Sequence, residues 1–409
     1  MDVLLEKSQL KNGEVVGISG SKSETNRLLL LQALYPGLII ENASDSDDSI
    51  VMRNCLVSNS SIKDVHHAGT AMRFLISYYS SKENEEVVLT GSQRMKERPV
   101  DALVNALRAL GADITYLEKE GYPPLKIKGK KLRKHKVEIA ASISSQYISS
   151  LMLIAPSLFH GMEIKLIGPV TSWSYIRMTA QILKFLGTDV HLKEQVLSIP
   201  PLNRPAINKF TVESDWSSAS YFYSLIALSP LETVLELNSF RNGSLQGDAL
   251  LSELYRDFGV ETTFKKNTAV LKKTHFPHKT HFEYNLNNTP DIAQTIAVTC
   301  LGLGVTCKLT GLHTLKIKET DRLTAMQAEL EKFGIAVFAD EDILCLTNAV
   351  EVLPNDKEIE TYNDHRMAMA FAPLALKTRL KIRDAEVVTK SYPGFWKDLT
   401  NLGVKIEKN

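Results

Sequence analysis

Cationic and acidic side chains cluster in one short stretch of the chain, residues 317–322, which read Ile-Lys-Glu-Thr-Asp-Arg. Lys318 and Arg322 are four residues apart, so on a helix the two like charges would share one face, which is mildly unfavourable. Glu319 lies between them. An anionic ligand beside an acid–base carboxylate would offset this repulsion. The stretch therefore predicts an anion-binding site next to a group that can transfer protons.

Two other segments combine cations with predicted helix starts. Residues 20–27 read Gly-Ser-Lys-Ser-Glu-Thr-Asn-Arg and contain Lys22, Ser23 and Arg27. A helix N-terminus attracts anions through its free N–H groups, although the spacing here is not that of a Walker A loop. Residues 93–99 contain Arg94 and two further cations around one acid. An arginine fork binds carboxylate or phosphate through two parallel hydrogen bonds, so both segments favour anionic ligands.

Four more segments add small, hydroxyl, amide, acidic and imidazole groups. They are Ala-Gly-Thr-Ala-Met-Arg at 68–73, Ser-Ser-Gln at 144–146, Pro-Asp at 290–291 and Asn-Asp-His-Arg at 363–366. Carboxylate, imidazole and ammonium groups close together alter one another's pKa and can serve proton transfer. Each segment taken alone is also compatible with a capped surface helix or a structural ion-pair network.

A repeat indicates which elements position these groups. A helix-like apolar pattern followed by a glycine and a β-like run occurs six times, at intervals of 69 to 76 residues, ending at Gly37, Gly111, Gly187, Gly259, Gly334 and Gly403. Glycine suits a helix C-terminus because it adopts the left-handed conformation at little cost. We expect a second helix in each unit, beginning near Ser23, Thr70, Ser144, Ser217, Pro290 and Asn363. The pattern predicts an α/β protein with six repeats, three in each of two domains, 20–213 and 1–19 plus 214–409.

Composition narrows the class of function. The 409 residues carry a net charge of +1, which argues against a broad nucleic-acid-binding surface. Four scattered cysteines, without metal-ligand spacing, argue against a structural zinc or a disulfide framework and favour a reducing compartment. The N-terminus lacks the apolar core of a signal peptide, and the apolar runs are interrupted. We therefore expect a cytoplasmic protein that binds neither nucleic acid nor membrane.

In combination, these motifs closely resemble the 5-enolpyruvylshikimate-3-phosphate synthase family of enolpyruvyl transferases. The matching segments are Gly-Ser-Lys-Ser-x-x-Asn-Arg, Ala-Gly-Thr-Ala-Met-Arg, Arg-Met-Lys-Glu-Arg-Pro, Ser-Ser-Gln, Lys-Glu-Thr-Asp-Arg-Leu and Asn-Asp-His-Arg-Met-Ala-Met, which occur in the family's order. The resemblance implies two domains of three βαβαββ units each, an inside-out α/β barrel arrangement, with the active site in the cleft between the domains. It implies a monomer without metal or organic cofactor.

The resemblance also implies a reaction in the shikimate pathway, which leads to chorismate and the aromatic amino acids. The carboxyvinyl group of phosphoenolpyruvate passes to the 5-hydroxyl of shikimate 3-phosphate through a tetrahedral ketal, and phosphate leaves. The residues implied for phosphoenolpyruvate are Lys22, Gly69, Arg94, Gln146, Arg322, Arg366 and Lys390. Those implied for shikimate 3-phosphate are Lys22, Ser23, Arg27, Ser144, Ser145, Gln146, Ser172, Tyr175, Asp291, Thr314 and Lys318.

The catalytic roles are a hypothesis. Asp291 is the expected base for the hydroxyl, while Glu319 and Lys22 are expected to move protons at the methylene, with His365 in support; the allocation among them stays open. The chain departs from the family at His67, Phe74 and Thr314, which bears on substrate affinity and on sensitivity to the herbicide glyphosate. Two alternatives remain: a UDP-N-acetylglucosamine enolpyruvyl transferase, disfavoured because Gln93 replaces the usual cysteine, and a non-catalytic anion-binding protein on the same scaffold.

Overall fold

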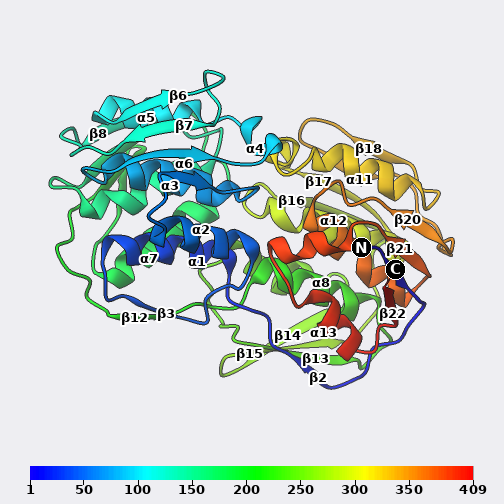
Figure 1. Cartoon of the computed structure of the whole chain (residues 1–409). Helices are drawn as coiled ribbons and strands as arrows, with labels where there is room; N and C mark the ends of the chain where they lie inside the picture. Colours follow the sequence, from blue (N-terminus) through cyan, green and yellow to red (C-terminus); the bar gives the residue numbers. More distant parts are fainter. Residues whose placement is uncertain (409) are drawn as a thin grey trace. The chain divides into compact units, whose positions relative to one another are not determined.

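The chain forms two compact units in the computed structural model, which describes residues 1–408. One unit is Gly20–Val212, which we call the inner unit because it is inserted within the sequence of the other. The outer unit combines Met1–Ser19 with the chain from Glu213 onward, and both names refer to the sequence alone. The chain therefore passes between the units twice, after Ser19 and after Val212 (Figure 1). Each unit is an α/β structure of small sheets and helices.

The inner unit contains two four-stranded sheets and one strand pair. Their strands, in sheet order, are β4 (Ile62–Asp64), β5 (Glu86–Thr90), β7 (Leu125–Lys128) and β6 (Asp113–Tyr116); β8 (Lys136–Ala140), β9 (Met162–Ile167), β11 (Val196–Ile199) and β10 (His191–Lys193); and β3 (Ile39–Glu41) with β12 (Lys209–Thr211). The helices are α1 (Lys22–Leu34), α2 (Asp47–Val57), α3 (Gly69–Ser81), α4 (Gln93–Lys96), α5 (Asp101–Leu110), α6 (Ser145–Ile154), the 3₁₀ turn η1 (Ala155–Ser157) and α7 (Trp173–Leu186).

The outer unit contains three four-stranded sheets. Their strands, in sheet order, are β2 (Glu14–Val16), β13 (Val234–Asn238), β15 (Thr268–Lys273) and β14 (Val260–Lys265); β16 (His281–Asn285), β17 (Thr306–Thr310), β19 (Leu344–Leu346) and β18 (Val337–Ala339); and β20 (Lys357–Ile359), β21 (Leu380–Ile382), β1 (Val3–Leu5) and β22 (Ile406–Lys408). The helices are α8 (Trp216–Leu228), α9 (Leu251–Leu254), α10 (Ala293–Leu303), α11 (Arg322–Glu331), α12 (His365–Phe371) and α13 (Phe395–Asn401). Five 3₁₀ segments join them: η2 (Gly247–Leu250), η3 (Pro290–Ile292), η4 (His313–Ile317), η5 (Ala372–Leu376) and η6 (Ala385–Lys390).

All five four-stranded sheets share one topology. The first two strands are parallel, and the second strand then pairs antiparallel with the last strand of a β-hairpin, whose other strand forms the edge. In the last sheet the N-terminal strand β1 takes the hairpin position, pairing Val3 with both Ile382 and Lys408. Parallel strands require a crossover, and a helix such as α3 or α10 supplies it. The sheets are thus copies of one βαβαββ unit.

The repeated glycines have the backbone conformation expected at helix ends. Positive φ angles occur at all six, Gly37, Gly111, Gly187, Gly259, Gly334 and Gly403. At Gly259 a side chain is also excluded sterically, because a Cβ would lie 1.7 Å from the backbone oxygen of His275. The glycine pattern therefore marks turns that no other residue type makes as readily.

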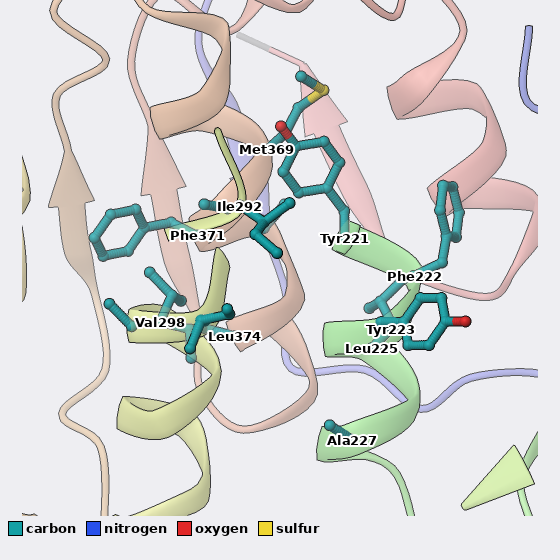
Figure 2. Close-up of a cluster of buried hydrophobic side chains, with 14 of the residues drawn as sticks. Tyr221, Phe222, Tyr223, Leu225, Ala227, Ile292, Val298, Met369, Phe371 and Leu374 are labelled. Atoms are coloured by element: carbon teal, nitrogen blue, oxygen red, sulfur yellow. The ribbon is translucent and has the colours of Figure 1, made fainter. Parts of the chain in front are cut away.

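Helices buried on most sides form the core of the outer unit (Figure 2). Nearly every residue of α8 is buried, and Tyr221, Phe222 and Leu225 project from it into the cluster that Figure 2 shows. Val298 of α10 and Met369 of α12 belong to the same cluster. Polar groups inside this core bond to one another, as Ser220 does with Thr295 at 3.0 Å between hydroxyl oxygens. Because α8 is buried around almost its whole circumference, it packs as a central helix.

Within residues 1–408, no helix combines the length and the apolar character that crossing a bilayer requires.

Candidate active-site residues

The guanidinium of Arg322 is the centre of the site residues in the outer unit. Its Nε donates to Oδ2 of Asp364 at 2.6 Å, its Nη1 to Oδ1 of Asp291 at 3.0 Å, and its Nη2 to Oε2 of Glu319 at 2.9 Å. The Arg322 residue is only 1% exposed. Burial alone would lower the pKa of Arg322, but the negative charges of Asp364, Glu319 and Asp291 outweigh it and raise that pKa. The arginine is therefore a permanent cation between three carboxylates.

Helix N-termini bring these residues together although 31 and 42 positions separate Arg322 from Asp291 and Asp364. Arg322 is the first residue of α11, whose N-cap Asp321 accepts hydrogen bonds from Leu323 N and Thr324 N. Asp364 is the N-cap of α12 and accepts from Arg366 N at 2.9 Å. Asp291 lies in η3, which leads directly into α10. Because the repeated units start their helices at the same end, distant motifs meet there.

Three further cations contact the same carboxylates. Lys318 Nζ lies 3.7 Å from Asp291 Oδ1, and Arg366 Nη2 lies 3.3 Å from Asp291 Oδ2. Lys390, at the end of η6, places Nζ 3.0 Å from Glu319 Oε1. His365 Nδ1 lies 3.5 Å from Asp364 Oδ1. The outer unit thus gathers seven of the predicted site residues: Asp291, Lys318, Glu319, Arg322, His365, Arg366 and Lys390. Together with Asp364, which was not predicted as a site residue, we call them the outer cluster.

One expectation about this stretch was wrong. Lys318 and Arg322 do not share a helix face, because Lys318 follows η4 and only Arg322 belongs to α11. The two cations are close because both contact Asp291, with a turn between them. The repulsion between the two cations is offset by the carboxylate of Asp291, which lies 27 residues before Lys318 in the chain.

Lys22 and Ser23 begin α1 in the inner unit. Ser21 is the N-cap, and its hydroxyl accepts from Glu24 N at 3.4 Å. Lys22 Nζ lies 3.4 Å from Oδ2 of Asp48, a buried carboxylate in the first turn of α2. Asp48 was not among the predicted site residues, and its sequence context, Ser-Asp-Ser-Asp-Asp-Ser, resembles any acidic helix start.

Arg27 is held inside the inner unit by uncharged oxygens. Its guanidinium donates to Thr179 Oγ1 at 2.7 Å, to the Ser23 carbonyl at 2.8 Å, to Ser149 Oγ at 3.2 Å and to the Tyr175 carbonyl at 3.3 Å. Burial lowers the pKa of Arg27 to about 10, so the group remains cationic near neutral pH. These bonds join the first turns of α1 and α7 to α6. Phe74, one of the departures from the family, packs against this cation with its ring centroid 5.4 Å away.

The guanidinium of Arg98 lies against the start of α3. Gly69 is the first residue of this helix, and a Cβ there would lie 2.5 Å from Arg98 Nη1, so any larger residue would displace that guanidinium. Gln146, in the first turn of α6, donates to Thr70 Oγ1 at 3.3 Å. The hydrogen bonds of Arg27 and Gln146 thus link α1, α3, α6 and α7 near their N-termini, where the helix dipoles contribute partial positive charge.

The remaining predicted residues lie at similar positions. Ser144 is the N-cap of α6 and accepts from Gln146 N at 3.2 Å, with Ser145 following it. Ser172 precedes α7 with φ of 51°, and Tyr175 N bonds to its carbonyl. Arg94, in the short helix α4, pairs with Glu97 at 3.2 Å and is largely exposed. We call this group the inner cluster: Lys22, Ser23, Arg27, Gly69, Arg94, Ser144, Ser145, Gln146, Ser172 and Tyr175.

A surface groove and one predicted residue, Thr314, lie outside the groups described above. The groove, of about 810 Å³ between α5 and the sheet of β8 and β9, contains none of the predicted site residues. Thr314 lies in η4, and its Oγ1 is buried without a hydrogen-bond partner among residues 1–408. Within the same residues, no group of three or more His, Cys, Asp or Glu side chains has the arrangement of a metal site.

Chemically, the outer cluster combines cations that can bind an anion with carboxylates that can accept protons. Four cations, Lys318, Arg322, Arg366 and Lys390, contact the carboxylates of Asp291, Glu319 and Asp364. Each of these carboxylates is in direct contact with at least one cation, so groups that can bind an anion and groups that can transfer protons lie side by side. The arrangement suits general acid–base chemistry on an anionic substrate.

Comparison with known proteins identifies the family. Residues 40–399 match the family EPSP synthase (3-phosphoshikimate 1-carboxyvinyltransferase). A 3-phosphoshikimate 1-carboxyvinyltransferase from Bacteroides fragilis (strain YCH46) is 40% identical over 409 residues, which cover 99% of this chain and 98% of the relative. The protein of that name from Haemophilus influenzae (strain ATCC 51907 / DSM 11121 / KW20 / Rd) is 36% identical, covering 95% and 96% of the two chains.

Solved structures share the fold. An EPSP synthase from Acinetobacter baumannii superposes with a TM-score of 0.77 at 21% identity, covering 99% of both chains. The enolpyruvyl transferase NikO from Streptomyces tendae superposes with a TM-score of 0.75 at 15% identity, covering 99% of this chain and 98% of its own. The fold expected from the motifs and repeats is thereby confirmed, and the chain belongs to the EPSP synthase (3-phosphoshikimate 1-carboxyvinyltransferase) family.

Proposed function

We propose that this protein transfers the enolpyruvyl group of phosphoenolpyruvate to the 5-hydroxyl of shikimate 3-phosphate and releases phosphate, as a step of the shikimate pathway. Family membership across residues 40–399 and the names of relatives up to 40% identical support this reaction. The single structural observation that carries the proposal is the outer cluster, in which Arg322 bonds to Asp291, Glu319 and Asp364 while further cations surround these acids.

Phosphoenolpyruvate, with its phosphate and carboxylate, calls for several cations. We assign it Lys22, Gly69, Arg94, Gln146, Arg322, Arg366 and Lys390. Charge-assisted hydrogen bonds are each worth about 1.5–3 kcal/mol, so a few of them supply strong binding. Arg322 is already bonded to three carboxylates, and it therefore contributes mainly by fixed charge and by orienting those acids. Gly69, having no side chain, lets the guanidinium of Arg98 approach the first turn of α3 closely.

Shikimate 3-phosphate presents a phosphate, a carboxylate and hydroxyls. We assign it Lys22, Ser23, Arg27, Ser144, Ser145, Gln146, Ser172, Tyr175, Asp291, Thr314 and Lys318. Two observations support the assignment. The charge of Arg27 is buried among uncharged oxygens, an environment that an anionic ligand would stabilise. The buried hydroxyl of Thr314 has an unused donor that a phosphate oxygen could accept.

The chemistry consists of an addition followed by an elimination. A proton is added to the methylene carbon of phosphoenolpyruvate, C2 becomes electrophilic, and the 5-hydroxyl attacks C2 as it loses its proton. The tetrahedral ketal then loses phosphate together with a proton of the new methyl group. Protons are thus supplied twice, to the methylene carbon and to the departing phosphate, and removed twice, from the hydroxyl and from the methyl group, which requires both acids and bases close to the reacting atoms.

We assign the proton of the hydroxyl to Asp291 and the proton traffic at the methylene to Glu319 and Lys22, with His365 in support. Glu319 contacts Lys390 and Arg322, two of the cations assigned to phosphoenolpyruvate, so its carboxylate fits the proton acceptor in the elimination step. The ammonium of Lys22 is a proton donor by nature and fits the addition step. The proposed reaction consumes no cofactor, and we further propose that the protein acts as a cytoplasmic monomer.

Phosphate release by the purified protein tests the proposal directly. Phosphoenolpyruvate is supplied with shikimate 3-phosphate in one assay and with UDP-N-acetylglucosamine in another. Release only with shikimate 3-phosphate is the expected result. Release only with the nucleotide sugar would reassign the acceptor, and no release from folded protein that binds shikimate 3-phosphate would indicate a scaffold used for binding alone.

A further inference from the structure

The outer cluster depends on a turn with an unfavourable backbone conformation. Tyr362 and Asn363, immediately before Asp364, have φ angles of 51° and 55°. Residues with a side chain rarely adopt this left-handed region, and two in succession cost free energy that surrounding contacts must offset. The turn matters because Asp364 bonds to Arg322 and caps the helix that carries Arg366.

Glu329 supplies those contacts. It is fully buried, and its Oε1 accepts the hydroxyl of Tyr362 at 2.8 Å. Its Oε2 accepts Glu360 N at 3.1 Å and Lys332 Nζ at 2.6 Å. Lys332 Nζ also donates to the carbonyl of Glu358 at 2.8 Å. A buried carboxylate with three donors, one of them a cation, is fully satisfied, and two of the three belong to the segment that makes the turn.

Glu329 and Arg322 act from the same face of α11. Seven residues separate them, which on an α-helix means an angular offset of about 20° and an axial distance of about 10 Å. Arg322 bonds to Asp364 at the end of the segment, and Glu329 bonds to Glu360 and Tyr362 earlier in it. The helix therefore holds the segment at two points, through a cation at one and an anion at the other.

We propose that Glu329 is a positioning residue for the enolpyruvyl transfer, holding the 360–364 turn so that Asp364 keeps Arg322 in place and Arg366 is in position to bind phosphoenolpyruvate. It makes no contact with substrate itself. This inference rests on the proposed function for its kinetic consequence, although its structural half stands on the contacts of Glu329 alone. Neither the family resemblance nor the cation motifs draw attention to this residue.

Kinetics of Glu329→Gln test the inference. The amide keeps the shape but replaces one acceptor oxygen with a donor, so the turn loosens. We expect KM for phosphoenolpyruvate to rise about tenfold or more, with a smaller change in kcat, because the binding groups are displaced. Tyr362→Phe removes one hydrogen bond and should move KM in the same direction by less. In an Arg366→Lys background, Glu329→Gln should have little further effect, because both changes act through one group.

Leu235→Ala is the matched control, since Leu235 is a buried core residue in β13, outside the segment 358–366. It should lower the melting temperature without raising KM for phosphoenolpyruvate. An unchanged KM in Glu329→Gln and Tyr362→Phe, with melting temperatures lowered as in the control, would overturn the inference and leave Glu329 a purely structural residue.

Hydrogen exchange separates this inference from the proposed function. The amides of Asp364 and Arg366 are bonded to the Thr361 carbonyl and to Asp364 Oδ1. They should exchange at least about tenfold faster in Glu329→Gln than in wild type or in Leu235→Ala. If wild type shows no turnover, the proposed function fails, while the exchange rates still decide whether Glu329 holds the turn. Equal exchange rates of these two amides in wild type, Glu329→Gln and Leu235→Ala would refute the proposal that Glu329 holds the turn.

Discussion

Asp248 offers the sharpest test of the electrostatics in the outer unit. It lies buried in η2, and the hydroxyl of Ser217 donates to its Oδ2. Burial, followed by the negative charge of Asp291, raises the pKa of Asp248 to about 7, although Ser217 and Arg366 act in the opposite direction. A carboxyl group of this kind is protonated in the folded protein at pH values where it is ionised in the unfolded chain.

The sign and size of the effect follow from that difference in pKa. Between the ordinary value of 3.8 and about 7, the folded state binds the proton and the unfolded state does not, so stability from this group falls as pH rises. At about 1.36 kcal/mol for each pH unit, a difference of about 3 units sets an upper limit of about 4 kcal/mol. Replacing Asp248 with Asn removes the titration while keeping an acceptor for Ser217. The variant should therefore become more stable relative to wild type as pH rises from 4.5 to 7.5, by about 2–4 kcal/mol.

Urea unfolding at several pH values measures this difference. The chain has three tryptophans, of which Trp216 and Trp396 lie in the outer unit and Trp173 in the inner unit. In a Trp173→Phe background, fluorescence therefore reports unfolding of the outer unit alone. The measured quantity is the free energy of unfolding of the Asp248→Asn variant minus that of the protein with Asp248, both in the Trp173→Phe background. A difference that stays constant from pH 4.5 to 7.5, or that decreases as pH rises, would refute the reasoning.

Three further changes test separate parts of the structure. Glu319→Gln should lower kcat by about 10²–10⁴-fold with KM nearly unchanged, because a proton acceptor is lost while shape is kept; a raised KM with retained kcat in steady-state assays would contradict this role. Arg322→Lys loses the fork that joins the carboxylates, so kcat/KM should fall about tenfold to a hundredfold, and a value equal to wild type would show that the fork is dispensable. Burial, with the charge of Lys377, lowers the pKa of Lys273 to about 8, so the folded state binds fewer protons than the unfolded chain between about 8 and 10.5. Wild type should therefore gain stability relative to Lys273→Met by up to about 2 kcal/mol between pH 7.5 and 9.5 in urea titrations, and a flat or falling difference would count against that pKa.

The sequence predicted repeated elements well because glycine has a conformational role that few residues share. All six marked glycines have positive φ, and the expected helix starts near Ser23, Thr70, Ser144 and Asn363 lie within two residues of the observed ones. Strand positions such as Leu380–Ile382 follow from the alternation of apolar and polar residues in the sequence, and the two apolar residues of this strand are buried. Local rules suffice for these features because each depends on a few adjacent residues.

The partners of the cations could not be predicted in the same way. Lys318 and Arg322 were read as neighbours on a helix, whereas Asp291 brings them together from another element. Asp48 and Glu329 gave no signal, since one lies in an ordinary acidic helix start and the other in a mixed polar helix. An ion pair between distant residues depends on tertiary packing, which no local pattern contains.

The repeat nevertheless relates some of these distant residues to one another. One site residue in each of five repeats precedes the glycine that ends that repeat by 12 to 17 positions: Lys22 before Gly37, Arg94 before Gly111, Ser172 before Gly187, Arg322 before Gly334 and Lys390 before Gly403. The one remaining repeat, the fourth along the chain, ends at Gly259, and no site residue was predicted in it. Asp248 lies 11 positions before Gly259, and its pKa responds to Asp291 and Arg366. Because each repeat presents the same part of its fold at the same end, a search by repeat position that allowed 11 to 17 residues would have included Asp248, whereas a search for cations could not.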